Sequence, residues 1–320
     1  MATKITEIYD GIQQLVSTDG RYLFEVVTVN NEATGGVILE AGTYSSSRTG
    51  NSGNVYETAV KAADASNLKH VVVALPGNGL SGALTAKERR YFAQHGSLYD
   101  WKEKAALPVV IALREVLEQN QLMPQHLTSD SAGAVLTTAL GIIAPMNSIE
   151  TVFQNVRTGW ANMSPAKLAW GMLVAENKHA KRHQAETPDK LAVNAATLAI
   201  VAANRPKSYD QRGLKPGKSL PMLQSYLYGL AAGPDRGVDP LLNDVVALVK
   251  RQNTAKVLFV SGRNDVLTNT PDIDERIKSV LKFVSIAGGA SVSAVMIEGG
   301  SHTTHTHYPQ FVEALHRSLY

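Results

Sequence analysis

The chain has 320 residues, of which 44% are hydrophobic and 18% are charged, and its formal net charge at pH 7 is +3. This composition predicts a globular protein with a large buried core and excludes an intrinsically disordered chain. So small a charge surplus does not predict nucleic-acid binding, and the lack of cysteine excludes disulfides, thiolate metal sites and cysteine nucleophiles.

The first ten residues carry acidic groups where an export signal has its apolar core. No uncharged apolar stretch reaches the length of about 18 residues that a membrane span needs. We therefore expect a cytoplasmic protein without a transmembrane segment. The sequence leaves open whether the protein is later released from the cell.

The first part of the chain predicts a mixture of helix and strand. Residues 4–17 carry apolar side chains at helical spacing and predict a short leading helix. Residues 22–29 and 37–41 are rich in aromatic or β-branched side chains and flank a short polar turn, which predicts an antiparallel hairpin. A polar loop at 44–54 and a helix at 55–66 follow.

A continuous apolar run at residues 70–75 ends abruptly in Pro76-Gly77-Asn78-Gly79. Such runs are typical of strands that are buried on both faces of a mostly parallel sheet. Residues 83–94 and about 105–119 predict helices, and the apolar positions of the second helix recur at spacings of three and four.

Residues 126–140 have the pattern of a strand, a sharp turn and a helix, and a further strand is predicted at 149–153. After a long stretch of Pro-interrupted helical sequence, the strand pattern returns at 256–260 and 292–297, and an amphipathic helix ends the chain from about Pro309.

This order of elements predicts an α/β protein with a mostly parallel central sheet that is flanked by helices. Its core comprises residues 1–157 and 251–320, and an α-helical cap insertion at 158–250 interrupts it.

Reactive residue types follow four of the predicted strands, where parallel sheets place functional groups. In chain order, the four segments are Pro76-Gly77-Asn78-Gly79, Ser129-Asp130-Ser131-Ala132-Gly133, Ser261-Gly262-Arg263-Asn264-Asp265 and Glu298-Gly299-Gly300-Ser301-His302. A serine hydroxyl needs an imidazole to take its proton, and the imidazole needs a carboxylate to orient it. The oxyanion that forms needs backbone amides as donors. Together these residue types predict acyl-transfer chemistry.

With its amide loop first and then Ser, Asp and His in that order, the sequence resembles the α/β-hydrolase superfamily. The resemblance covers the sheet core on both sides of the insertion and not the insertion itself. It implies an α/β-hydrolase fold with Ser131 as nucleophile, His302 as base and Asp265 as the acid that orients His302. It also implies that the backbone N–H groups of Asn78 and Ala132 form the oxyanion hole.

Two departures from the family pattern concern the nucleophile turn and the oxyanion loop. Ser129 stands where the family has glycine, so it is a rival nucleophile, and we prefer Ser131 because Gly133 and a helix follow it. Pro76 stands where family members often have histidine, which leaves the loop intact because it acts through backbone amides.

The acid and the base have alternatives as well. Asp272 and Asp274 compete with Asp265, which comes first after its strand. His302 is the first member of a His-x-x-His-x-His cluster that also contains His305 and His307. Such a cluster is a weak zinc signal, and we predict neither a metal nor a cofactor.

The function predicted from these residues is a serine hydrolase that cleaves a carboxylic ester through an acyl-enzyme, with a small-molecule or lipid-like ester as its substrate. Aromatic and methionine side chains of the insertion either line an apolar pocket or pack the cap on the core: Trp160, Trp170, Met172, Tyr226 and Tyr228. A peptidase or amidase of the same fold is one alternative, and a non-catalytic binding or structural component of a larger assembly is another. The oligomeric state is not predicted.

Overall fold

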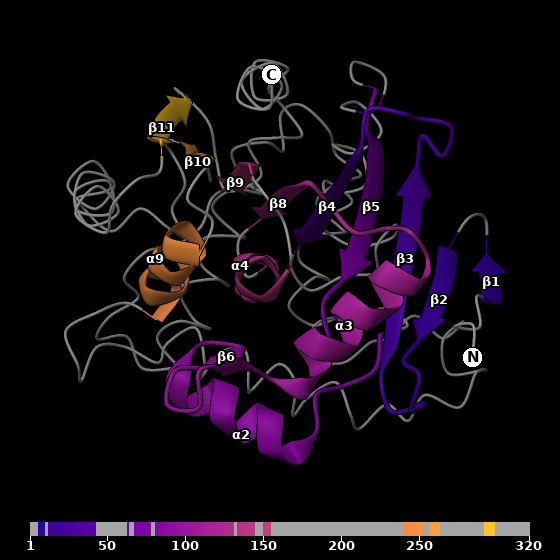
Figure 1. Cartoon of the computed structure of the whole chain (residues 1–320), viewed down its shortest axis with the longest axis horizontal. Coiled ribbons are helices and arrows are strands. Elements are labelled where there is room, and N and C mark those ends of the chain that lie inside the picture. The colour runs from indigo at the N-terminus through magenta and orange to yellow at the C-terminus, as the bar shows by residue number, and fades with distance from the viewer. Residues whose placement is uncertain are drawn as a thin grey trace, which may run out of the picture.

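A computed structural model of the chain describes residues 6–9, 12–42, 63, 67–77, 81–130, 133–144, 150–154, 240–251, 256–262 and 291–297. Within these ranges lie a nine-stranded sheet, a two-stranded sheet and the helices that pack beside them (Figure 1). No helix in these ranges is long and apolar enough to cross a membrane.

The nine-stranded sheet has the order β1-β2-β3-β5-β4-β8-β9-β10-β11. Its strands are β1 Thr6–Tyr9, β2 Ile12–Val16, β3 Leu23–Val29, β4 Val37–Gly42, β5 Lys69–Ala74, β8 His126–Asp130, β9 Glu150–Gln154, β10 Lys256–Gly262 and β11 Ser291–Ile297. Six neighbouring strands run parallel to one another, namely β5, β4, β8, β9, β10 and β11. At the other end of the sheet, β1, β2 and β3 pair antiparallel with their neighbours. The predicted mostly parallel sheet is therefore confirmed, as are the strands predicted at 70–75, 149–153, 256–260 and 292–297.

The helix predicted at residues 4–17 is wrong, because β1 and β2 form an antiparallel hairpin there. β2 continues the sheet by pairing with β3, which places Leu15 opposite Phe24, and both side chains are buried. Short apolar runs fit a helix and a strand equally well, so a partner outside the segment decided the structure.

The hairpin predicted for residues 22–29 and 37–41 is also wrong, because β5 lies between β3 and β4. β3 pairs antiparallel with β5, and β4 pairs parallel with it. The loop between β3 and β4 is anchored to the segment before β5: Gly35 N donates to Asn67 O and Lys69 N donates to Gly36 O, each at 2.8 Å. These bonds carry the chain across the position of β5 instead of folding it back beside β3.

Two of the predicted helices are confirmed with shifted starts. Helix α2 spans Ala86–His95, and Thr85 and Glu88 form a capping box at its start. Helix α3 spans Pro108–Gln119 and begins with the proline that is favoured in a first helical turn. The residues before α3 form β7 Ala105–Ala106, which pairs with β6 Tyr99–Asp100.

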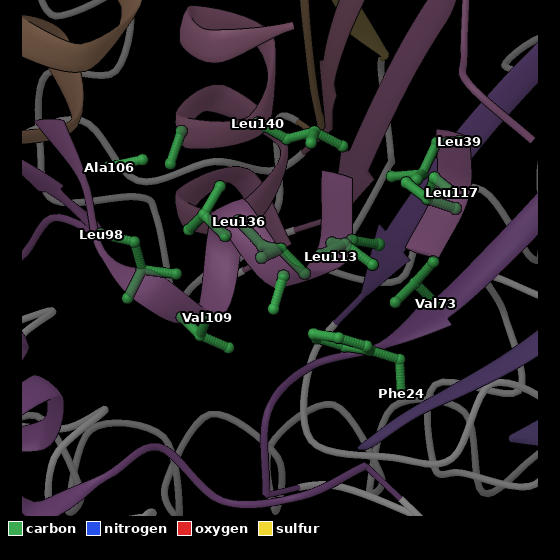
Figure 2. Packing of buried hydrophobic residues seen from close by; sticks show 14 of the residues in the cluster. Phe24, Leu39, Val73, Leu98, Ala106, Val109, Leu113, Leu117, Leu136 and Leu140 are labelled. Carbon is green, nitrogen blue, oxygen red and sulfur yellow. The ribbon is translucent and has the colours of Figure 1, made fainter. Parts of the chain in front are cut away.

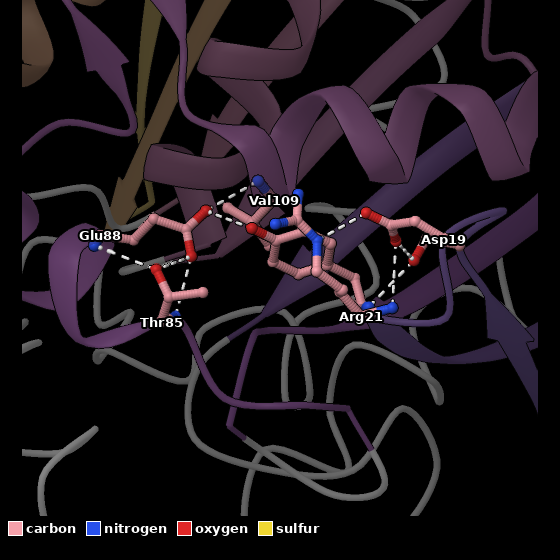
Figure 3. A network of polar contacts seen from close by, with 7 residues as sticks. Asp19, Arg21, Thr85, Glu88 and Val109 are labelled. Atoms are coloured by element: carbon pink, nitrogen blue, oxygen red, sulfur yellow. Dashed lines mark hydrogen bonds and ion pairs between the residues drawn. The ribbon is translucent and has the colours of Figure 1, made fainter.

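A buried carboxylate joins these two helix starts to the turn between β2 and β3 (Figure 3). Glu88 Oε1 accepts hydrogen bonds from the Tyr22 hydroxyl at 3.0 Å and from Val109 N at 2.9 Å. Its Oε2 accepts from the backbone N and the hydroxyl of Thr85. One side chain thus fixes α2, α3 and the β2–β3 turn relative to one another.

The hydrophobic core lies between one face of the sheet and the helices α3, α4 and α9 (Figure 2). Alternate side chains of the strands point into it, among them Phe24, Leu39 and Val73, and they meet Leu113 of α3 and Leu136 of α4. Full burial of a side chain of this size contributes about 1.5–3 kcal/mol.

Helix α4, Gly133–Ile143, is buried from Gly133 to Ile142, because the sheet, α3 and α9 surround it. Helix α9, Pro240–Arg251, packs against α4 and contributes Leu248 to the same core. Residues 240–250 fall within the predicted insertion, and residues 158–239 lie outside the described ranges, so the division into core and cap stays a prediction. The helices predicted at 55–66 and after Pro309 also lie outside the described ranges, apart from residue 63.

Candidate active site

One row of paired residues crosses the six parallel strands and serves as a reference level for the site. The row comprises Val73, Ala41, Ser129, Phe153, Phe259 and Ala294 on β5, β4, β8, β9, β10 and β11. Because these strands are parallel, the chain leaves all of them at the same edge of the sheet. This carboxyl edge is where the four predicted motifs follow their strands.

The distance along the chain from the row to each predicted residue is short. Ser131 lies two residues past the row and Pro76 lies three residues past it. Asp265 lies six residues past the row and His302 lies eight. Because the strands share this register, the chain enters all four segments within a few residues of the same row.

The connection from β8 to α4 is short. β8 ends at Asp130 and α4 begins at Gly133, so only residues 131 and 132 join the strand to the helix. A strand and a helix joined by so few residues are the context that a nucleophile elbow requires. The helix start also directs its free backbone N–H groups and the positive end of its dipole toward this turn.

Ser129, the rival nucleophile, lies inside the sheet. It pairs with Ala41 of β4 and Phe153 of β9, and its exposed fraction is 1%. Its side chain shares a face of β8 with Leu127, which belongs to the core under α4. Its hydroxyl is buried and has no hydrogen-bond partner in the part of the chain that the structure describes. Ser129 is therefore poorly placed to meet a substrate.

Both stems of the predicted oxyanion loop are held in place. Pro76 and Gly77 are buried, and Gly77 has a φ of 82°, which favours glycine. Gly77 N donates to Gly82 O, and Gly82 N donates to Leu23 O of β3, each at 2.8 Å. The loop is thus closed on itself and attached to the neighbouring strand.

The residues that carry the predicted chemistry lie outside the described ranges: Asn78, Ser131, Ala132, Asp265 and His302. The same holds for their alternatives Asp272 and Asp274, for His305 and His307, and for the aromatic side chains of the insertion. Their roles stay predictions. Within the described ranges, no group of three or more His, Asp or Glu side chains is arranged to hold a metal ion.

No protein-family model and no curated protein matches the chain, but solved structures do. The 2-hydroxy-6-oxo-6-phenylhexa-2,4-dienoate hydrolase of Rhodococcus aligns with 99% of this chain and 99% of its own, at a TM-score of 0.60 and 14% identity. An enol-lactonase from Burkholderia xenovorans aligns over 96% and 99%, at a TM-score of 0.53 and 14% identity. A hydrolase from Pseudomonas aeruginosa aligns with 98% of this chain and 99% of its own, at a TM-score of 0.51 and 16% identity.

This chain has the α/β-hydrolase fold. The fold predicted from the order of the motifs is therefore confirmed. A likeness at this level of identity establishes the fold alone, because one fold serves many reactions.

The sequence analysis missed a buried polar junction beside the α/β-hydrolase core. Asp244 in α9 is fully buried and accepts hydrogen bonds from the Ser97 hydroxyl, at 2.9 and 2.7 Å, and from Trp101 Nε1 at 2.9 Å. It joins the β6 region to the helix that leads into β10. Only its place in the apolar face of an amphipathic helix could have predicted its burial.

The sequence analysis also passed over Ser81, which follows the predicted oxyanion loop. Its side chain is fully buried at the carboxyl edge, between the ends of β3 and β5. A serine in a polar loop carries no periodic signal, so its contacts appear only when the strands are paired.

Proposed function

We propose that this chain is a serine hydrolase that cleaves carboxylic esters. Ser131 Oγ bonds to the acyl carbon while His302 takes the hydroxyl proton, and Asp265 orients the imidazole and stabilises its charged form. The amides of Asn78 and Ala132 bind the oxyanion. The ester C–O bond then breaks, and His302 returns the proton to the leaving alcohol. Water attacks the acyl-enzyme in the same way and releases the acid.

The observation that carries the proposal is the common level at which the four motifs leave one edge of the sheet. Two residues separate β8 from α4, and Ser131 is the first of them. A serine in such a turn stands before the start of a buried helix, where a nucleophile meets substrate and an oxyanion meets N–H donors.

The loop lengths also support the proposal. Neighbouring strands lie about 4.8 Å apart, so β11, three strands from β8 in the sheet, lies about 14 Å from it. The five residues from Ile297 to His302 span up to about 17 Å, which is enough to reach the level of Ser131. Asp265 follows β10, which lies between these strands, so its loop has less distance to cover.

An ester is the preferred substrate class because a simple ester has a good leaving group and needs no further group in the site. The structural neighbours include an enol-lactonase, whose name specifies a cyclic ester. A small-molecule or lipid-like ester fits this chemistry.

The first test is labelling of the full chain with a fluorophosphonate, which phosphonylates an activated serine. Wild type, Ser131→Ala and Ser129→Ala are compared, with the labelled peptide identified by mass spectrometry. We expect labelling of wild type and Ser129→Ala and none of Ser131→Ala. A wild-type chain that is neither labelled nor active on any ester would favour the non-catalytic binding component.

The second test separates an esterase from an amidase or peptidase. p-Nitrophenyl acyl esters and p-nitroanilides with the same acyl groups are compared in wild type and Ser131→Ala. We expect ester turnover that depends on Ser131 and anilide turnover at least about 100-fold lower in kcat/KM. Comparable kcat/KM for both leaving groups would replace the esterase by an amidase.

A further inference from the structure

We propose that Ser81 is the positioning residue of the oxyanion loop. Its hydroxyl attaches the loop at residues 76–82 to the ends of β3 and β5, and in this way it fixes the backbone amide of Asn78. This inference rests on the proposed function, because it assigns a role within the same acyl-transfer site.

The Ser81 hydroxyl bridges two strands with both of its hydrogen-bonding functions. It donates to Ala74 O, at the end of β5, at 2.9 Å and accepts from Glu25 N of β3 at 2.9 Å. In the register of the two strands, which pairs Val26 with Val73, Glu25 is the next residue opposite Ala74. The serine side chain therefore extends the β3–β5 ladder by one step, inside the protein, with an exposed fraction of 0%.

The bridge stands two residues after the predicted oxyanion loop, and backbone hydrogen bonds close the segment at residues 76–82 at its base. Gly77 N donates to Gly82 O, and Gly82 N donates to Leu23 O, each at 2.8 Å. Ser81 precedes Gly82, so the hydroxyl and these bonds fix the same stem to β3 and β5. The N–H of Asn78 belongs to the planar peptide that begins at Gly77. The orientation of that donor consequently depends on how firmly the base of the loop is held.

Removing the hydroxyl takes one hydrogen-bonding partner from the Glu25 amide and from the Ala74 carbonyl. Because buried polar groups are costly without such partners, we expect the base of the loop to shift. An oxyanion donor acts only within about 2.7–3.1 Å of the developing charge, and the loss of one donor lowers kcat about 100- to 1000-fold. A misplaced donor retains part of this effect. We therefore expect Ser81→Ala to lower kcat about 10- to 100-fold, with KM within about twofold of wild type, because ground-state binding does not use the oxyanion hole.

The matched control is Ser97→Ala. Ser97 is also 0% exposed, and its hydroxyl also bonds in two directions, as donor to Asp244 and as acceptor from Tyr99 N. Both variants lose a buried hydroxyl and are expected to lose thermal stability to a similar extent. Only Ser81→Ala is expected to lose kcat.

The experiment measures kcat and KM on a p-nitrophenyl ester and the Ki of an alkyl boronic acid, whose tetrahedral serine adduct resembles the oxyanion intermediate. We expect Ser81→Ala to raise the boronic acid Ki by about the same factor by which it lowers kcat, and Ser97→Ala to leave both within about twofold. Should Ser81→Ala fail to fold, Ser81→Cys keeps the shape with a weaker donor and is expected to lower kcat with KM retained.

The two possible failures give different results. A wild-type chain without ester turnover overturns the proposed function and the role of Ser81 with it. Wild-type turnover together with an unchanged kcat and boronic acid Ki in Ser81→Ala, or equal losses of kcat in Ser81→Ala and Ser97→Ala, overturns the role of Ser81 alone.

Discussion

At the scale of single residues, Ser129 shows how a departure from a family pattern is accommodated. The hydroxyl stands where the superfamily has glycine, and it is buried under α4 without a partner among the described residues. An unsatisfied buried hydroxyl costs about 1–3 kcal/mol. The site therefore accommodates a small side chain, and the Ser129 hydroxyl adds nothing to the stability of the fold.

We predict that Ser129→Ala keeps ester turnover within about twofold of wild type and raises the free energy of unfolding by up to about 1 kcal/mol, because the orphan hydroxyl is removed. Urea unfolding and steady-state kinetics measure the two quantities. A folded Ser129→Ala protein without activity would show that this hydroxyl takes part in the reaction. The matched comparison is Thr137→Val, because the buried Thr137 hydroxyl donates within α4 and its removal is expected to be destabilising.

Glu40 and His70 form a buried hydrogen-bonded pair on the opposite face of the sheet. Glu40 Oε1 of β4 contacts His70 Nδ1 of β5, and both side chains are almost fully buried. They alternate along their strands with Leu39 and Val71, which point into the core beneath α3 and α4. The face away from these helices therefore carries buried polar side chains as well as apolar groups.

We predict that Glu40→Ala lowers the free energy of unfolding by about 1–3 kcal/mol, because the substitution removes a buried hydrogen-bonding partner of His70. A double-mutant cycle with His70→Gln is expected to give a coupling energy of about 0.5–3 kcal/mol. The pair of the half-buried Arg114 and the exposed Glu118, with 3.8 Å between its charged atoms, serves as the control. Glu118→Gln is expected to change stability by less than about 0.5 kcal/mol. Equal effects at both pairs would contradict the prediction.

At the scale of elements, the Glu88 junction of α2, α3 and the β2–β3 turn gives stability a dependence on alkaline pH. Burial and the negative charge of Glu88 raise the pKa of Tyr22 to about 12 from an ordinary value of 10.0. Below pH 10 the phenol is neutral in both the folded and the unfolded chain, so its contribution to stability is complete. Between pH 10 and 12 the unfolded chain ionises first, and stability falls as the pH rises.

We predict that Tyr22→Phe is less stable than wild type at about pH 8, because the hydrogen bond to Glu88 is lost, and that the difference becomes smaller at about pH 11. Urea midpoints at the two pH values measure the change. Tyr91→Phe is a parallel case, because burial and Asp100 raise the pKa of Tyr91 to about 12 as well. A difference between wild type and Tyr22→Phe that stays constant with pH would contradict the assigned role of the phenol.

At the scale of the whole molecule, the features that could be predicted from the sequence are those with a local cause. The apolar run of β5 and Pro108 at the start of α3 marked their elements directly. The leading helix was wrong because β2 pairs with β3, which lies outside the pattern of residues 4–17. The 22–41 hairpin was wrong because β5, which is more than 25 residues away in the chain, lies between β3 and β4.

The candidate site divides in the same way. The order of its motifs is a property of the sequence, and it predicted the fold. The row that places Ser129 and Ala294 at one level depends on six paired strands, and no local pattern contains it. Ser81 and Asp244 escaped prediction because hydrogen-bonding partners that are distant in sequence determine what they do.

The Asp244 junction connects two parts of the chain that are far apart in sequence, the segment between β5 and α3 and the helix before β10. Asp244 bonds to Ser97 and Trp101, which are more than 140 residues away. α9 packs against α4, and α4 packs against the sheet, so the junction attaches the β6 region to the central core. Its contribution to stability therefore depends on the packing of α9 on α4 and of α4 on the sheet, and not on one element alone.

We predict that Asp244→Ala lowers the free energy of unfolding by about 2–4 kcal/mol, because the buried Ser97 hydroxyl and the Trp101 indole lose a charged acceptor. Trp101 is already 40% exposed and is expected to become more accessible, which acrylamide quenching of its fluorescence measures against a Trp101→Phe background. Asp100→Ala is the control, since Asp100 accepts hydrogen bonds from the backbone amides of Lys102 and Glu103 within its own turn. Its effect on stability is expected to be smaller, and the quenching of Trp101 distinguishes a local loosening from global unfolding. Unchanged quenching and unchanged stability in Asp244→Ala would show that α9 and the β6 region are held together by apolar packing alone.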